Sequence, residues 1–224
     1  MPELTPDVLM MGFLWYVAFL FSTTCHEAAH ALVAKIGGDE TAALGGQVTL
    51  NPVPHIRREP FGMVLIPILS FLFSHSMIGW ASAPFDPSWQ RRYPQRAAWM
   101  ALAGPAANFT LMTIAGIALR VGLLHGWFPE EARTPGFAGL AYLALWVFFT
   151  LNLFLGAFNL VPVPPLDGST AITLFMPQKT ALRYLDWLHE SNLRMLGLVA
   201  AVVLFRSLFD YISFAARAVF FHGL

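Results

Sequence analysis

Charged residues and cysteine are both scarce in this sequence. Only 12% of its 224 residues are Asp, Glu, Lys or Arg, and 57% are hydrophobic. Soluble globular domains carry about 25% charged and about 45–50% apolar residues. A core of this size cannot bury so much apolar surface. The composition therefore predicts an integral membrane protein.

The few charges are balanced and scattered along the chain. Thirteen Lys and Arg residues face thirteen Asp and Glu residues, and no basic stretch is interleaved with aromatic residues. We therefore expect no nucleic-acid partner, because such binding needs a positive surface. The single cysteine, Cys25, can form neither an internal disulfide nor a Cys-Cys metal motif. Any metal must then be held by histidines and carboxylates.

Long apolar runs with few charges predict several membrane-spanning helices. A bilayer core of about 30 Å requires about 20 predominantly apolar residues in a helix. Four runs meet this length, the first of them interrupted by a short polar motif: residues 8–34, 97–124, 136–166 and 195–221. In the last run, Arg206 and Asp210 are four positions apart on one helix face, so we expect them to neutralise one another.

A further apolar run, residues 61–80, either crosses the membrane or enters it and returns. It contains Pro67 and a polar cluster of Ser70, Ser74, His75 and Ser76. These residues suit a re-entrant segment that lines a polar cavity, which is the arrangement we favour. Just before it, residues 44–50 place the β-branched Val48 and Thr49 after two glycines, which predicts a short β-hairpin.

The polar motif inside the first run is His26-Glu27-Ala28-Ala29-His30. Helix positions four apart differ by about 40° in rotation and about 6 Å in rise, so both imidazoles project toward one point and can chelate one zinc ion. Glu27 is rotated by about 100° from His26, which suits a base acting on water rather than a ligand. Ionisable groups within a membrane segment cost about 2.5–3.5 kcal/mol each, so three together indicate a bound cation.

A catalytic zinc ion usually has three protein ligands, so one more donor is needed. The candidates outside the motif are Asp167, Glu40, His55, His75 and Asp86. Asp167 is favoured because it follows the longest uncharged run and lies beside Gly168, where the backbone can approach the histidine helix closely. His55 and His75 are better explained as residues at the membrane interface or as hydrogen-bonding partners of a neighbouring helix.

Three motifs in this order resemble the site-2 protease family of intramembrane zinc metalloproteases: residues 26–30, Ala103 to Asn108, and Asn159 to Gly168. The match also includes Leu50 to His55 and Gly79 to Ala81. The resemblance covers roughly residues 20–170 and points to the compact prokaryotic branch without a PDZ or CBS domain. It implies that His26, His30 and Asp167 bind one Zn²⁺ per chain and that Glu27 activates water.

The same resemblance places Asn159 near the scissile bond and makes Asn108 a candidate for substrate binding or transition-state support. Asn108 could equally form a hydrogen bond to a neighbouring helix, because small residues around it allow close packing. The chain departs from the family where Ser169 replaces a frequent glycine and Ala83 a frequent basic residue.

The expected fold is an all-α polytopic membrane protein, a bundle of about 4–6 transmembrane helices with a small membrane-associated β-hairpin. Residues 1–224 form a single domain, with a catalytic core over roughly 8–176 and a C-terminal membrane helix over roughly 193–221. The expected location is a prokaryotic cell membrane, crossed several times.

The predicted function is regulated intramembrane proteolysis: hydrolysis of a peptide bond in or near a transmembrane segment of another protein. The partners are that substrate and the lipid bilayer, and the edge of the hairpin would hold the unwound substrate. One alternative is a non-catalytic membrane zinc-binding or transport protein, which would tolerate loss of Glu27. Another is a zincin of the prenyl-protein endopeptidase type, with Glu190 as third ligand.

Overall fold

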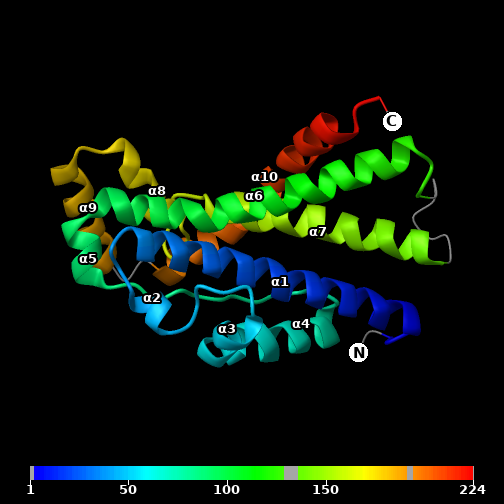
Figure 1. The fold of residues 1–224 in the computed structure, drawn as a ribbon, viewed down its shortest axis with the longest axis horizontal. Coiled ribbons are helices and arrows are strands. Elements are labelled where there is room, and N and C mark those ends of the chain that lie inside the picture. Colours follow the sequence, from blue (N-terminus) through cyan, green and yellow to red (C-terminus); the bar gives the residue numbers. More distant parts are fainter. Residues whose placement is uncertain (1–2, 129–135, 191–193, 224) are drawn as a thin grey trace.

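The computed structural model describes residues 3–128, 136–190 and 194–223 (Figure 1). Every regular element in these ranges is helical. In chain order they are α1 (Pro6–Ile36), α2 (Thr41–Leu44), α3 (Pro52–Arg58), the π-helix η1 (Phe61–Leu65), α4 (Ile66–Ser74), α5 (Pro87–Arg92), α6 (Pro94–Leu124), α7 (Phe137–Asn159), α8 (Gly168–Ala171), the 3₁₀-helix η2 (Ile172–Phe175), α9 (Gln178–Glu190) and α10 (Arg194–Phe221).

Four of the described helices are long and apolar enough to cross a membrane: α1, α6, α7 and the Leu196–Phe221 part of α10. They correspond to the four long runs of the sequence. Helix α6 packs against both α1 and α7, and the three lie lengthwise beside one another (Figure 1). Ala34 of α1 and Ala97 of α6 are buried together in one apolar cluster. Small side chains let the two backbones approach closely.

The β-hairpin predicted for residues 44–50 is wrong, because the structure contains no strand among the residues it describes. Leu44 ends α2, and the chain then turns at Gly46, whose φ is 73°. Two prolines follow at positions 52 and 54, and the Asn51 side chain caps α3 by accepting from the backbone N–H of Val53 (3.0 Å). Helix α3 thus begins where the second strand of the hairpin would have continued.

The segment 44–50 is held by a side-chain hydrogen bond rather than by backbone hydrogen bonds between strands. The Nε2 atom of Gln47 donates to the backbone oxygen of Ser82 (3.1 Å), and Gln47 itself is almost fully buried. Because this hairpin does not form, the prediction that its edge holds the substrate is also wrong.

The apolar run 61–80 folds back on itself. Its helical part, Phe61–Ser74, is shorter than a membrane crossing requires. His75 ends α4 in the left-handed region (φ 53°), and the chain returns without regular structure. The backbone N–H of Trp80 then donates to the carbonyl of Gly62 (3.0 Å), so the two ends of the run lie side by side. This is the path that the re-entrant arrangement requires.

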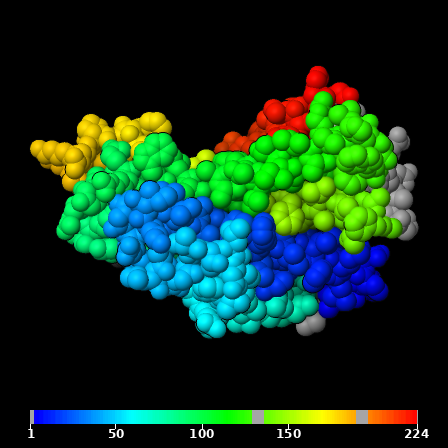
Figure 2. Space-filling model, in the orientation of Figure 1, coloured from blue at the N-terminus to red at the C-terminus, as the bar shows by residue number. Residues whose placement is uncertain are grey.

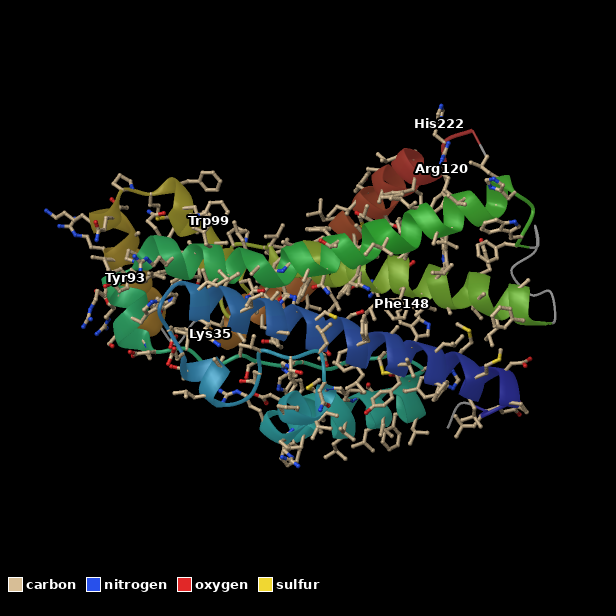
Figure 3. All side chains as sticks on the ribbon, viewed as in Figure 1. Lys35, Tyr93, Trp99, Arg120, Phe148 and His222 are labelled. Carbon is tan, nitrogen blue, oxygen red and sulfur yellow. The ribbon has the colours of Figure 1, made fainter. Side chains whose placement is uncertain are left out.

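Helix α10 rests on the bundle through aromatic side chains on one of its faces. Phe205 and Phe209 pack edge to face on Phe154 of α7. Near the C-terminal end of α10, Arg120 of α6 donates to the backbone oxygens of Phe220 (2.7 Å) and His222 (3.3 Å), as Figure 3 shows. The guanidinium thereby satisfies carbonyls that a helix end leaves without partners.

The space-filling view has a hollow above α6, bounded by α9 on one side and α10 on the other (Figure 2). Trp99 of α6 lies at its edge (Figure 3) and is 61% exposed.

Candidate metal centre

Three side chains from distant parts of the sequence bring their metal-binding atoms to one point. His26 and His30 belong to α1, and Asp167 immediately precedes α8. The two Nε2 atoms are 2.9 Å apart, and the Oδ2 atom of Asp167 lies 3.0 Å from Nε2 of His26 and 3.3 Å from that of His30. Donors bound to tetrahedral zinc at about 2.0–2.1 Å are about 3.3 Å from one another. The three atoms therefore have nearly the spacing that zinc requires.

The second nitrogen of each imidazole is bound to an acceptor. Nδ1 of His30 donates to the backbone oxygen of Met100 (2.7 Å), and Nδ1 of His26 donates to Oδ1 of Asn108 (2.6 Å). In a neutral imidazole the other nitrogen then carries a lone pair. Two nitrogen lone pairs and a carboxylate oxygen then converge, which is an arrangement that a cation between them stabilises. The donor set thus fits zinc.

Gly104 of α6 lies against this cluster. A Cβ atom at position 104 would touch Nε2 of both His26 and His30. The methyl group of an alanine would therefore overlap both imidazoles at the nitrogens that face Asp167. Helix α6 can approach the histidines this closely only because residue 104 has no side chain.

A tight connection after α7 positions Asp167. Helix α7 ends at Asn159, and three prolines between positions 162 and 165 prevent its continuation. The backbone of Gly168 then packs on the carbonyl of Leu160, so closely that a Cβ at 168 would overlap it. Gly168 thus approaches the end of α7, whereas the sequence suggested an approach to the histidine helix.

Of the five positions considered for a third ligand, Asp167 is the one that the described structure places with the histidines. His55 donates from Nε2 to the backbone oxygen of Thr49 (3.1 Å), and Asp86 caps α5. The side chain of Asp167 is 23% exposed, compared with 8% for each histidine. The cluster is most accessible on the side of Asp167.

Glu27 is buried beside the cluster, with 6% of its surface exposed. It is close enough to His30 to interact with it electrostatically. No described residue forms a hydrogen bond or an ion pair with its carboxylate, which distinguishes Glu27 from the structural polar groups around it. A buried carboxylate without such a partner is available to accept a proton.

Asn152 of α7 belongs to the site, although the sequence did not single it out. Its Nδ2 donates to the backbone oxygen of Phe148 (2.9 Å) and to Oγ of Ser22 (2.9 Å). Its Oδ1 accepts from Nδ2 of Asn108 (2.9 Å). The Phe148 carbonyl can only accept a hydrogen bond, so it fixes which end of the Asn152 amide carries the donor. The Asn152 oxygen in turn fixes the orientation of the Asn108 amide. The Asn108 oxygen then fixes the tautomer of His26.

A polar side chain in the middle of an uncharged membrane run was the available signal for Asn152. Asn108 is fully buried on the side of His26 remote from the donor cluster. Asn159 lies at the end of α7, where its Nδ2 donates to the backbone oxygen of Leu155 (3.0 Å). Substrate contact by either asparagine stays a prediction. The side chain of Glu190, the alternative third ligand, lies outside the described part of the structure.

Two apolar pockets flank the cluster without including its side chains. One of about 400 Å³ lies between α1, α6 and the 48–50 segment, and its lining includes Ala28, Ala29 and Thr110. The other, of about 380 Å³, is lined by residues on both sides of Gly104 in the sequence, together with Trp99 and Leu160. The second pocket connects the surface of α6 with the end of α7, where the Asp167 connection begins.

Comparison with known proteins identifies the class. YwhC of Bacillus subtilis is 35% identical over 162 residues, which cover 72% of this chain and 68% of YwhC. Rip2 of Mycolicibacterium smegmatis is 28% identical over 154 residues, and Rip2 of Mycobacterium tuberculosis 30% over 155; both alignments cover 69% of this chain. All three relatives bear the name "putative zinc metalloprotease". No family model and no solved structure matches the chain.

These relatives and the four apolar helices define a membrane zinc metalloprotease. The chain belongs to the site-2 protease family, as its motifs indicated. It spans about two thirds of YwhC, and 54% of the length of each Rip2 protein.

Proposed function

We propose that this protein is an intramembrane zinc endopeptidase that cleaves a membrane protein in or beside a transmembrane segment, in a bacterial cell membrane. The observation that carries the proposal is the position of the donor cluster within α1, a helix able to cross the bilayer. His30 lies six residues before the end of α1 at Ile36, or about 9 Å along the helix axis. A peptide bond cut there would lie below the membrane surface.

His26, His30 and Asp167 would hold the zinc ion, and the surrounding residues support its chemistry. When bound, zinc supplies Lewis acidity to the peptide carbonyl and to a water molecule. The Glu27 carboxylate takes a proton from the water whose oxygen attacks the carbonyl carbon. Glu27 then gives that proton to the amide nitrogen as the C–N bond breaks, which leaves a carboxylic acid and an amine.

The substrate would reach the cluster through the hollow between α9 and α10 (Figure 2). Exposed apolar side chains suit a lipid-embedded segment there: Trp99, which is 61% exposed, and Leu160, which is 38% exposed, line the same pocket. Leu160 also touches Gly168, the neighbour of Asp167, so the hollow adjoins the accessible side of the cluster. The substrate helix must unwind locally, because its carbonyls are otherwise occupied by hydrogen bonds.

The decisive variant is Glu27→Gln, which keeps the size of the side chain and removes the base. We expect zinc content to stay at one ion per chain and cleavage to fall by about 10²–10⁴. Membrane proteins that copurify with Glu27→Gln identify candidate substrates, and wild-type protein should cut them in reconstituted vesicles. Glu40→Gln, which changes an exposed glutamate on the next connection, is the matched control and should cleave normally.

The same experiment separates the alternatives. A non-catalytic zinc-binding or transport protein would lose nothing in Glu27→Gln, and equal cleavage by both variants would refute general-base catalysis by Glu27. A cluster completed by Glu190 would retain zinc when Asp167 is removed.

A further inference from the structure

Two opposite charges lie exposed near the middle of α10. The apolar part of this helix, Leu196–Phe221, has 26 residues and is about 39 Å long. Arg206 and Asp210 are ten and fourteen residues from its start, or about 15 and 21 Å, so both fall in its central third. Charged side chains at this depth are expensive in lipid and are normally paired.

These two side chains have no ion-pair partner within the part of the chain that the structure describes. Both are exposed, and the intrahelical pair expected from the sequence is not formed. Pairs at this spacing are weaker when the basic residue precedes the acidic one, as it does here. The bundle cannot supply a partner either, because α10 contacts it through Phe205 and Phe209 on another face.

The two charges belong to a continuous exposed stripe, at spacings of three and four residues along one side of α10. We call it the α10 stripe, and its members are Val199, Val203, Arg206, Asp210, Phe214 and Arg217. Such spacing is that of a helix–helix contact seam. The side chains of Val203 and Phe214 are 65% and 71% exposed.

We propose that a second copy of this chain docks on the α10 stripe, with Arg206 of each copy paired to Asp210 of the other. Two copies inserted in the same direction present parallel α10 helices, so a residue in one copy meets the same depth in the other. Arg206 and Asp210 differ by about 6 Å in rise, which the long arginine side chain can span. A two-fold axis along the membrane normal then satisfies all four charges at once.

Charge complementarity favours a second copy over a different partner. In its central third the stripe offers one positive and one negative group a turn apart, so this part of it is complementary to itself under two-fold symmetry, whereas Arg217 lies nearer the C-terminal end of α10. A different membrane protein would need opposite charges at the same two depths. The proposal concerns assembly and stands independently of the proposed peptidase activity.

Disulfide crosslinking in native membrane vesicles tests the geometry. On a Cys25→Ser background, Val203→Cys lies on the stripe, whereas Leu204→Cys lies about 100° around the helix at nearly the same depth. The two wild-type side chains are similarly exposed, at 65% and 69%, which makes them a matched pair. We expect oxidation to link Val203→Cys chains into dimers about tenfold more than Leu204→Cys chains. Equal yields, or crosslinks only to other proteins, would overturn the proposal.

Charge complementation tests the pairing itself. Arg206→Asp puts two acids at the central positions 206 and 210, and Asp210→Arg puts two bases there, so each variant should dimerise poorly alone. Coexpressed with different tags, the two variants should form heterodimers as abundantly as wild type forms homodimers. Loss of one pair should weaken association by about three- to twentyfold.

A double variant, Arg206→Asp with Asp210→Arg, keeps the composition and restores both pairs if the single variants insert poorly. Dimerisation that is unchanged in either single variant, or not restored by coexpression or by the double variant, would show that these charges do not hold two copies together.

Discussion

Nδ1 of His26 donates a hydrogen bond to Oδ1 of Asn108 across 2.6 Å. This contact joins the candidate metal centre to a buried amide chain that continues through Asn152 to α7. The geometry of the donor atoms is therefore set by three helices, although only α1 carries the histidine motif.

The first prediction concerns Asn152→Leu, which removes the far end of that chain. Asn108 would lose the closer of two acceptors of its Nδ2 group and keep only the backbone oxygen of Ser22 at 3.4 Å, so its amide, and with it the tautomer of His26, would be held less firmly. Mutation of a residue that hydrogen-bonds to a metal-binding histidine typically lowers metal affinity by about 10–100-fold. We expect zinc affinity to fall by that factor, measured by competition with a chelator, and the spectrum of the cobalt-substituted protein to change.

Thr113→Val provides its control, because Thr113 donates only to the carbonyl of Phe109 within α6. It should leave both zinc affinity and the cobalt spectrum unchanged. Unaltered zinc affinity in folded Asn152→Leu would mean that the amide chain does not support the centre.

The second prediction is that Gly104→Ala prevents zinc binding. The added methyl group would overlap both Nε2 atoms, so the two imidazoles would have to move away from the geometry that brings them together with Asp167. Metal analysis of the purified variant should find almost no zinc, with a loss of about 1–3 kcal/mol in stability from overpacking. Ala106→Val enlarges an exposed residue two positions further along α6 and should bind zinc normally. Full zinc content in Gly104→Ala would place the ion elsewhere.

The third prediction is that Asp167→Ala lowers zinc occupancy, because two protein donors remain where three converge. Glu40→Ala, Asp86→Ala and Glu190→Ala should keep one zinc per chain. Metal content measured on all four proteins at equal concentration decides among them. If Asp167→Ala retains stoichiometric zinc, the third ligand lies at another position, and Glu190 would be the next residue to test.

The fourth prediction follows from the fold-back of residues 61–80. Because Trp80 returns to Gly62, the connections on both sides of this run should face the same side of the membrane. On a Cys25→Ser background, Arg57→Cys and Arg92→Cys should react with a membrane-impermeant thiol reagent from the same side of sealed vesicles. Both wild-type residues are exposed. Labelling from opposite sides would mean that this run crosses the bilayer.

Local sequence was sufficient for the features that depend on neighbouring residues. The long spans follow from extended apolar runs, and the pairing of His26 with His30 follows from helical periodicity. The break after Asn159 follows from the prolines, which cannot continue a helix. Each of these rests on contacts within a few positions of the chain.

The hairpin prediction at residues 44–50 failed because a strand depends on a partner segment and not on neighbouring residues alone. Its turn signal was local, but a strand exists only with a partner strand, and the described fold offers this segment a helix start at Pro52 and a bond from Gln47 to Ser82 instead.

The centre itself was decided by the tertiary structure. Asp167 meets His26 across 141 positions of sequence, and Asn152 meets Asn108 across 44. Neither Gly104 nor Asn152 carries a spacing signature that predicts its place beside the histidines. The sequence alone specified which residues can bind zinc and which helices can span a membrane, since composition and periodicity govern both. Only the packing of α1, α6 and α7 decided where the donor atoms meet and what orients them, because those contacts depend on how closely small residues let the helices approach.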